Sequence, residues 1–206
     1  EITTRLVGSE MCIRDRVDAN KNPTGKRVTT NDYDSADYYY INKSSLPKVY
    51  GGFNTSLSWK GFDLSAIFAY SIGGYIYNRD ITMILHNGSL EGRDWSTEIL
   101  KRWTPDNRYT DVPALSTTSN DWNSASTRFL QNNSYMRLKN LTLSYNLPKQ
   151  WISKLSLSSV QVYVQGDNLF TIHRNQGLDP EQGITGITYY RYPAMRTISG
   201  GINVSF

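Results

Sequence analysis

The sequence predicts an all-β fold: an antiparallel, up-and-down transmembrane β-barrel, of which this chain forms about five C-terminal strands in an open, curved sheet with long extracellular loops. Two observations predict it. Apolar and polar residues alternate with a period of two over segments about ten residues long, the length at which a tilted strand crosses a bilayer. The connections between these segments are alternately short and long, as periplasmic turns and extracellular loops are.

The first element is a hairpin. Alternation begins at Val49 and continues to Trp59, and after Lys60-Gly61 it resumes at Phe62. Two alternating runs separated by two residues, the second a glycine, predict a tight antiparallel turn. We expect the second strand to extend past Gly73-Gly74 to about Tyr77.

A long polar region from residue 78 to 132 follows the hairpin without sustained alternation. Within it, Asp94 is in a position to cap a short helix that ends before Thr104-Pro105, with Trp95, Ile99 and Trp103 on one side. A connection of about this length is too long for a compact domain, so it belongs to a large scaffold or has its own purpose.

Three further strands complete the pattern. One begins at Tyr135 and ends at Leu147-Pro148, and its apolar residues change parity across Lys139-Asn140, which predicts a β-bulge. Another alternates around Val160, Val162 and Val164. After a second long loop, from Thr171 to about Met195, the last strand alternates from Ile198 to Phe206.

The ends and faces of these strands favour a membrane barrel over a soluble domain. The polar faces carry Asn, Ser, Thr, Gln and Asp, which in a dry core would leave many hydrogen bonds unmade but suit a wet lumen. The main alternative is a secreted, carbohydrate-binding β-sandwich. A sandwich would bury the apolar residues Phe62, Leu64 and Phe68 between two layers, and its long loops would leave from both ends.

Composition excludes several other classes. With 38% hydrophobic residues and a mean hydropathy of −0.51, no apolar run is long enough for a membrane-spanning helix. The net charge is +4, but Lys and Arg are scattered without a basic stripe, so no nucleic-acid partner is expected. A single cysteine, Cys12, excludes a disulfide framework within the chain.

The chain divides into three parts. Residues 1–16 share neither the composition nor the alternation of the rest and are predicted to be a non-native segment, comparable to a tag. Residues 17–46 are predicted to be an extracellular loop, and residues 47–206 the C-terminal strands of the barrel.

Several phrases in residues 46–206 resemble the C-terminal barrel region of the SusC/RagA family of TonB-linked outer-membrane proteins of Bacteroidetes. They begin with Leu46-Pro47-Lys48-Val49-Tyr50-Gly51-Gly52-Phe53, Trp59-Lys60-Gly61-Phe62-Asp63-Leu64-Ser65 and Arg102-Trp103-Thr104-Pro105-Asp106-Asn107. They continue with the run from Ser134 to Pro148, Gly166-Asp167-Asn168-Leu169-Phe170-Thr171, and the closing Gly200-Gly201-Ile202-Asn203-Val204-Ser205-Phe206.

The resemblance implies a barrel of about 22 strands, plugged by an N-terminal domain that is absent from these residues. It implies import of oligosaccharides or peptides across the cell outer membrane, driven by the TonB complex through the missing plug. It also implies a SusD-like surface lipoprotein over the long loops, and no catalysis or cofactor. The family's acidic, calcium-site-like loop survives only as a trace at Asp18-Ala19-Asn20-Lys21-Asn22-Pro23, so no metal is expected.

Two groups of residues are candidate sites. Phe206, Val204 and Ile202 resemble the C-terminal signal that the barrel-assembly machinery recognises, although an ordinary final strand can also end in Phe. The loop aromatics are candidates for stacking on a ligand or partner, and the plainer interpretation is that they fold the loops. They are Trp95, Trp103, Trp122, Tyr189 and Tyr190.

Catalysis has little support in the sequence. His86 and His173 are the only histidines, neither has the spacing of a metal ligand, and no nucleophile elbow or phosphate loop is present. An outer-membrane enzyme with a site around His173 is the third hypothesis, against the interpretation that His173 lies where a strand passes into a loop.

Overall fold

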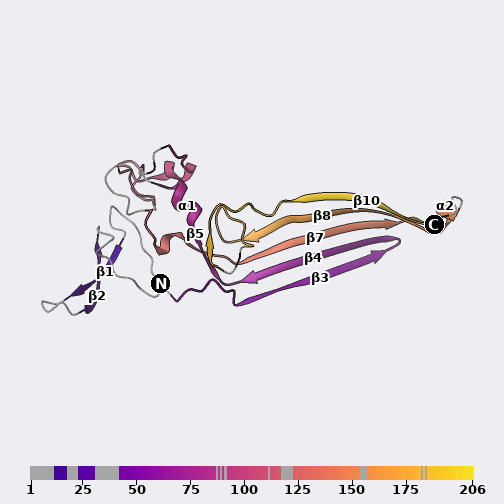
Figure 1. The fold of residues 1–206 in the computed structure, drawn as a ribbon, viewed down its shortest axis with the longest axis horizontal. Coiled ribbons are helices and arrows are strands. Elements are labelled where there is room, and N and C mark those ends of the chain that lie inside the picture. The colour runs from indigo at the N-terminus through magenta and orange to yellow at the C-terminus, as the bar shows by residue number, and fades with distance from the viewer. Residues whose placement is uncertain are drawn as a thin grey trace. The chain divides into compact units, whose positions relative to one another are not determined.

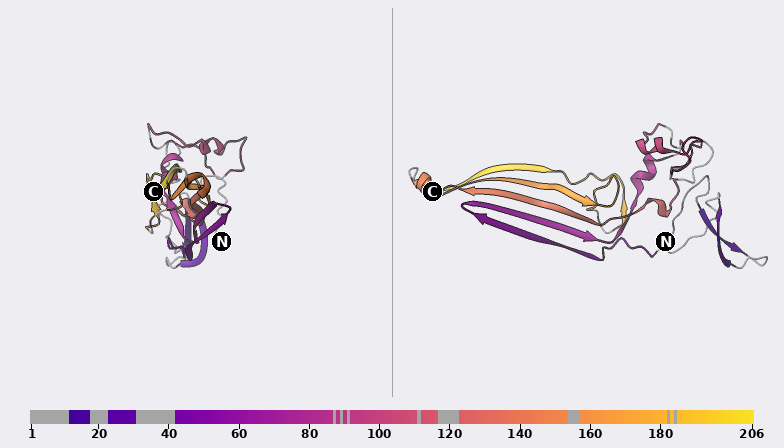
Figure 2. Two further views of the ribbon diagram at one scale, coloured as in Figure 1. Left: turned by 90° about the vertical axis from the view of Figure 1, so that its right-hand side faces the viewer. Right: turned by 180° about the vertical axis from the view of Figure 1, so that it is seen from behind.

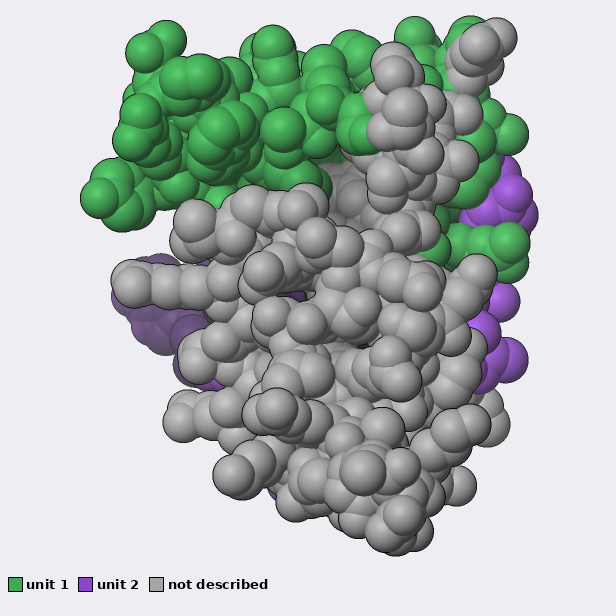
Figure 3. All heavy atoms as spheres, turned by 90° about the vertical axis from the view of Figure 1, so that its left-hand side faces the viewer, with its two compact units in different colours: residues 1–42, 78–129 green, residues 43–77, 130–206 purple. Residues whose placement is uncertain are grey.

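The computed structural model describes residues 12–17, 23–30, 42–86, 88, 90, 92–110, 112–116, 123–153, 157–181, 183 and 185–206. The chain forms two compact units, coloured separately in Figure 3. One comprises residues 43–77 and 130–206, and the other residues 1–42 and 78–129. The first unit contains the main sheet.

The main sheet has five antiparallel strands in the order β10-β8-β7-β4-β3. Within this sheet, strands that are consecutive along the chain are neighbours. Figures 1 and 2 show the five strands side by side. The strands are β3 (Val49–Trp59), β4 (Phe62–Ile72), β7 (Tyr135–Asn146), β8 (Ser159–His173) and β10 (Thr197–Ser205). This arrangement confirms the predicted up-and-down sheet.

The turn between β3 and β4 is as tight as predicted. Trp59 pairs with Phe62, and the two turn residues, Lys60 and Gly61, have φ angles of 48° and 89°. Two consecutive left-handed residues match the right-handed twist of the flanking strands, which is why glycine is favoured here.

The predicted extension of β4 to Tyr77 is wrong. Gly73 and Gly74 have φ angles of 82° and 76°, and these two left-handed residues end β4 at Ile72. The chain then forms β5 (Tyr75–Asn78) in a separate small sheet, of order β6-β5-β9. The other members of that sheet are β6 (Leu130–Asn132) and β9 (Ile187–Thr188).

A bulge in β7 keeps all three leucines of that strand on one face. Ala66 pairs with Leu141 and Phe68 with Leu138, so two pairs of apolar residues face each other although their spacing in β7 is odd. Lys139 is the additional residue between these pairs. The parity change in the sequence therefore preserves the face, as predicted.

The apolar face of the main sheet is open. Ala66 and Leu138 are buried on this face, but most of its larger side chains are exposed, among them Phe53 (47%), Leu57 (66%), Val164 (55%) and Ile198 (72%). In a sandwich, a second layer would bury these residues. Among the described residues of this unit no such layer covers them, so the sheet is a single curved wall.

Long and short connections leave the sheet at opposite ends. The short ones are Lys60-Gly61 and the segment between β7 and β8, which contains α2 (Lys149–Ile152). The long ones join β4 to β7 and β8 to β10. Figure 1 shows that α2 and the C-terminus lie at the same end of the sheet.

The second unit contains short elements. These are β1 (Cys12–Val17), β2 (Pro23–Thr30), α1 (Arg79–Ile84), and the 3-10 helices η1 (Thr97–Lys101) and η3 (Thr127–Phe129). β1 pairs with β2 in an antiparallel hairpin that includes part of the segment predicted to be non-native. The division of the chain at residues 16 and 46 stays a prediction.

The helix expected near Asp94 begins later and is of the 3-10 type. Ser96, and not Asp94, is its N-cap, and the Ser96 hydroxyl accepts a hydrogen bond from the Glu98 backbone N–H at 3.3 Å. Serine is among the favoured caps, and its short hydroxyl reaches the first turn. Ile99 is buried against Val112, but Trp95 and Trp103 lie outside this short helix, so the expected face of three residues is not formed. No helix among the described residues is long and apolar enough to cross a membrane.

A glycine in the last strand accommodates an aromatic ring from its neighbour. Gly201 pairs with Tyr163, and a Cβ added at Gly201 would lie 2.7 Å from the Tyr163 hydroxyl oxygen. We expect Gly201→Val to lower the free energy of unfolding of the full-length protein by about 1–3 kcal/mol, because the ring must move. Chemical unfolding measures this. In a Tyr163→Ala background the cost should shrink, and an equal cost there would contradict the steric explanation.

Candidate functional site

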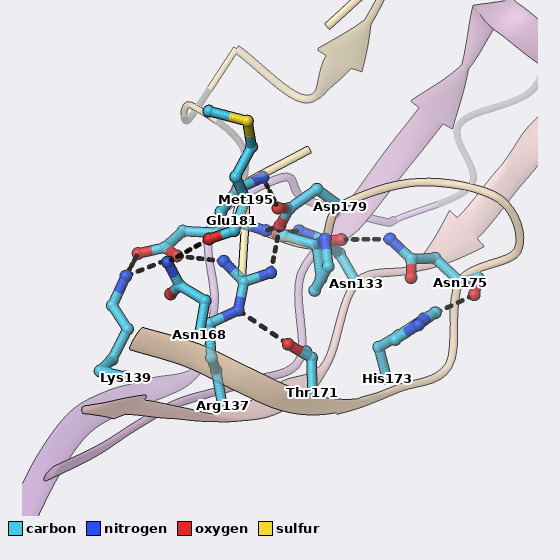
Figure 4. Close-up of polar contacts among 12 residues, drawn as sticks. Asn133, Arg137, Lys139, Asn168, Thr171, His173, Asn175, Asp179, Glu181 and Met195 are labelled. Carbon is cyan, nitrogen blue, oxygen red and sulfur yellow. Dashed lines mark hydrogen bonds and ion pairs between the residues drawn. The ribbon is translucent and has the colours of Figure 1, made fainter. Parts of the chain in front are cut away.

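The loop between β8 and β10, residues 174–196, is attached to the polar face of the sheet by a charge cluster. We call this segment the β8–β10 loop, and the cluster of Arg137, Lys139, Asp179 and Glu181 the clamp. Arg137 pairs with Asp179 at 2.5 Å and with Glu181 at 2.7 Å, and Lys139 pairs with Glu181 at 2.7 Å (Figure 4). β7 supplies both cations and the loop both carboxylates.

Arg137 is the centre of the clamp. Its side chain is 4% exposed, and each of its three guanidinium nitrogens has a partner, because Nε donates to Thr171 Oγ1 on β8 at 2.8 Å. A buried charge is tolerated when it is paired and its donors are satisfied. The planar fork of arginine suits two carboxylates at once.

The bulge in β7 contributes to the clamp. Lys139 is the bulge residue, and its ammonium reaches Glu181 from the polar side of the sheet, as the Arg137 guanidinium does. Asn140 points to the same side, where its amide donates to Asp167 Oδ1 at 2.8 Å. Two consecutive polar residues on one face are possible in a strand only where the alternation is interrupted.

Asp179 is held as a carboxylate. Burial acts to raise its pKa, but hydrogen bonds from the backbone N–H groups of Ala194 and Glu181, together with Arg137, outweigh burial and lower the pKa. Ala194 N donates to Oδ2 at 2.6 Å and Glu181 N to Oδ1 at 2.9 Å. Because the folded-state pKa is lowered, the stabilisation is present above the ordinary aspartate pKa and is lost only as the pH falls through the lowered value.

A second set of hydrogen bonds attaches the start of the loop. The Asn133 amide donates to the Pro180 carbonyl at 2.8 Å, and the Asn175 amide donates to Asn133 Oδ1 at 3.1 Å. His173 Nδ1 lies 2.8 Å from the Asn175 carbonyl oxygen, so this ring nitrogen carries the proton and donates. His173 thus has a loop-fixing contact where a strand passes into a loop.

A cavity of about 340 Å³ lies between the loop, β3 and β4. Its size is at the lower end of the range of small-molecule sites. Among the residues that the structure describes, the lining contains tyrosine, serine, asparagine and glycine but no Asp, Glu, Lys, Arg or His. The lining residues are Ser45, Pro47, Tyr50, Gly51, Ala69, Tyr70, Ser71, Gly73, Tyr75, Ile76, Asn133, Tyr135, Pro180, Gly183 and Gly186.

One tyrosine of the cavity is already engaged by a lysine. Lys43 Nζ lies 4.7 Å from the ring centroid of Tyr75. A hydrogen bond from Lys43, together with its positive charge, lowers the pKa of the Tyr75 phenol. Tyr50 and Tyr135 both pair with Ser71, so they share the polar face and offer hydroxyl groups and ring faces for a ligand.

The candidate loop aromatics belong to both units of the chain. Trp95 Nε1 donates to Nδ1 of the buried His86 at 3.0 Å, which fits a role in folding its own loop. Trp103 is half-buried in the same unit, and its backbone N–H donates to the Val112 carbonyl. Trp122 lies outside the described residues.

In the other unit, Tyr189 and Tyr190 are neighbours. Their ring centroids are 4.2 Å apart, and the side chains are 44% and 65% exposed. Tyr190 has a φ angle of 48°, which is uncommon for a residue with a bulky side chain. This pair is the part of the predicted aromatic set that the structure brings together.

The C-terminal residues lie on or beyond the apolar face of the last strand. Val204 pairs with Val160 and Ile202 with Val162, while Phe206 follows β10 and is 95% exposed. Their role as an assembly signal is untested by this geometry and stays a prediction.

No group of three His, Cys, Asp or Glu side chains suited to a metal ion occurs in the part of the chain that the structure describes. Residues 18–22 of the calcium-like trace fall outside that part. The sequence interpretation missed the clamp, because nothing in the sequence indicates that residues 179 and 181 return to β7. The one feature of the sequence that could have indicated an ion-pair site there was Arg137, a charged residue on the polar side of a predicted strand.

Comparisons with known proteins agree with this geometry. No family model matches the chain. TonB-dependent receptor P3 of Formosa agariphila is 34% identical over 166 residues, which cover 75% of this chain and 16% of that receptor. Receptor P26 of the same organism is 31% identical over 182 residues, and SusC of Bacteroides thetaiotaomicron 29% over 174 residues.

Solved structures agree as well. The RagAB peptide transporter matches with a TM-score of 0.79 and 34% identity, over 97% of this chain and 21% of that one. The RagAB peptide importer in its closed-closed state matches with a TM-score of 0.74 and 35% identity. The chain spans about a sixth to a fifth of the length of these relatives. With its structure matching part of the RagAB transporter, the chain belongs to the SusC/RagA family of TonB-dependent receptors, which are outer-membrane proteins.

Proposed function

We propose that the protein of which this chain is a part imports oligosaccharides or peptides across the outer membrane, powered by the TonB complex through a plug domain outside these residues. The chain supplies five strands of its barrel. It has no catalytic role in this proposal, and its polar face lines the path of the solute.

The observation that carries the proposal is the division of the sheet into two chemically different faces. The apolar face is exposed across every strand, as a wall against hydrocarbon requires. On the polar face, hydrogen-bonding side chains contact one another across strands, as Asn146 does with Asp63 and Asn203 with Gln161. Such a face is stable against a water-filled lumen and costly against lipid.

The cavity supports a solute that forms hydrogen bonds and carries no positive charge at this point. Its hydroxyl and amide groups can pair with sugar hydroxyls or with peptide N–H and C=O groups, and the tyrosine rings can pack on either. A cation placed there would lie near Lys43 at Tyr75 and would have no carboxylate among the described lining residues. Both substrate classes satisfy this chemistry, so the choice between them is left to the experiment.

A SusD-like lipoprotein over the long loops is the proposed partner. The exposed aromatics of the β8–β10 loop, Tyr189, Tyr190 and Tyr192, support a contact surface, because aromatic residues give large contact area at low entropic cost. The barrel-assembly machinery is the partner proposed for Phe206, Val204 and Ile202, and outer-membrane lipid for the apolar face.

Two rival functions have less support. A secreted carbohydrate-binding sandwich would need a second layer over Phe53, Leu57 and Val164, which are exposed. An outer-membrane enzyme around His173 has no nucleophile elbow or metal-ligand spacing in the sequence to support it, and the contact of Nδ1 with the Asn175 carbonyl fits a role in fixing the loop.

An uptake assay tests the proposal. Cells with the full-length receptor and cells lacking it are given fluorescent oligosaccharides or fluorescent peptides, with and without a protonophore. We expect receptor-dependent accumulation of one class, and its loss when the protonophore collapses the proton gradient that drives TonB. Equal accumulation of both classes with and without the receptor would contradict the proposal.

A further inference from the structure

The clamp joins elements that are distant in the sequence. Arg137 lies 42 residues from Asp179 and 44 from Glu181, and the Asn133 amide reaches Pro180 across 47 residues. The β8–β10 loop is therefore attached to β7 in its first third, in addition to its covalent links to β8 and β10. A free loop of this length would lose much conformational entropy on adopting one path, so these contacts must offset that loss.

The central ion pair of the clamp, Arg137 with Asp179, is buried. The side chains of Arg137 and Asp179 are 4% and 6% exposed, while those of Lys139 and Glu181 are about a third exposed, at 36% and 37%. Exposed ion pairs contribute little, whereas removing one partner of a buried pair leaves the other charge without compensation. The Arg137–Asp179 pair is therefore the part of the clamp on which the loop depends.

The loop so held forms one side of the cavity. Pro180, Gly183 and Gly186 line it opposite Ser71 and Tyr135 of the sheet. Pro180 stands between the two carboxylates of the clamp, so the position of this wall follows directly from the position of Arg137. The backbone of Asp179 and Glu181 is further fixed because the Glu181 and Ala194 N–H groups donate to the Asp179 carboxylate.

We propose that Arg137 is a positioning residue that fixes the β8–β10 loop across the polar face of the sheet as a rigid wall of the cavity, so that this loop is not a mobile lid. The proposal rests on the proposed function for the meaning of the cavity, but its test does not require transport. The clamp positions the wall and contacts no solute.

Amide hydrogen exchange of the full-length receptor in detergent or bilayers tests this. In Arg137→Gln, we expect peptides covering residues 179–196 to exchange faster by about tenfold or more, because Asp179 loses its buried cation and the Glu181 and Ala194 N–H groups lose a fixed acceptor. Peptides from β3 and β4 should exchange as in the parent. Arg137→Lys, which keeps the charge but not the fork, should recover part of the protection.

Lys139→Gln is the matched control. It removes a cation from the same strand and the same cluster, but one that is about a third exposed and pairs only with Glu181, so we expect less than about a threefold change. Asp179→Asn should reproduce the effect of Arg137→Gln from the loop side. Unchanged exchange in residues 179–196 would overturn the proposal. So would an equal increase throughout β3, β4 and the loop, since that would make Arg137 a residue of general stability.

The outcome is separable from the transport proposal. If exchange responds as expected while the receptor imports neither oligosaccharides nor peptides, the clamp stands and the proposed function fails. If uptake is receptor-dependent while Arg137→Gln leaves hydrogen exchange unchanged, the proposed function stands and the role of Arg137 in positioning the loop fails.

Discussion

Leu141→Arg is expected to destabilise the full-length receptor in a bilayer by about 2–4 kcal/mol, the cost of a cation on the lipid face near the bilayer midplane. Leu141 pairs with Ala66 and Gly166 on the apolar face. It lies four residues from Tyr145, whose ring packs on Phe62 at 4.4 Å near the short-turn end. At about 3.3 Å per residue along a tilted strand, this places Leu141 well inside the hydrocarbon.

Thr142→Arg is the control one position along the same strand. Thr142 lies on the polar face, where it donates to Asn140 Oδ1 at 2.9 Å. An arginine there reaches water, and we expect a cost below about 1 kcal/mol. Denaturant unfolding of both variants in lipid vesicles provides the comparison. If both variants lost the same free energy of unfolding, the two faces would not differ as assigned. If Thr142→Arg lost more, the lipid face and the lumen face would be the reverse of those assigned here.

The contrast between these two neighbours shows why so much of the fold could be predicted. A strand repeats every two residues, so Leu141 and Thr142 must face opposite sides, and the parity of apolar residues identifies the face directly. The bulge was predictable for the same reason, because the parity changes at Lys139. Lys60-Gly61 is a short-range turn signal that needs no tertiary information.

Other features depend on contacts that leave no periodic trace. Two left-handed glycines, Gly73 and Gly74, end β4 at Ile72. The sequence does not distinguish this pair from Gly51-Gly52, which lies inside β3. The choice of Ser96 over Asp94 as a helix cap depends on local backbone geometry, since both residues are good caps. The clamp depends on where a loop of 23 residues, 174–196, returns to the sheet, and charge alone does not choose Arg137 among the arginines of the chain.

Phe206 provides the second large expected effect. Its side chain is 95% exposed and follows the last paired residue, Ser205, so it has little contact with the rest of the sheet. A role in folding stability therefore predicts almost no effect of Phe206→Ala. A role as a recognition signal for strand addition by the barrel-assembly machinery predicts a several-fold fall in the amount of receptor in the outer membrane.

The two roles separate when both quantities are measured on the same full-length variants. We expect Phe206→Ala to lower the receptor level in isolated outer membranes, while the purified protein refolded into vesicles unfolds within about 1 kcal/mol of the parent. Ser205→Ala, adjacent but on the polar face, should change neither. Because an exposed aromatic at the membrane interface also anchors the strand in lipid, a larger loss of stability in vesicles would assign Phe206 to anchoring. If the Phe206→Ala receptor reached the outer membrane in the same amount as the parent, Phe206 would not be part of an assembly signal.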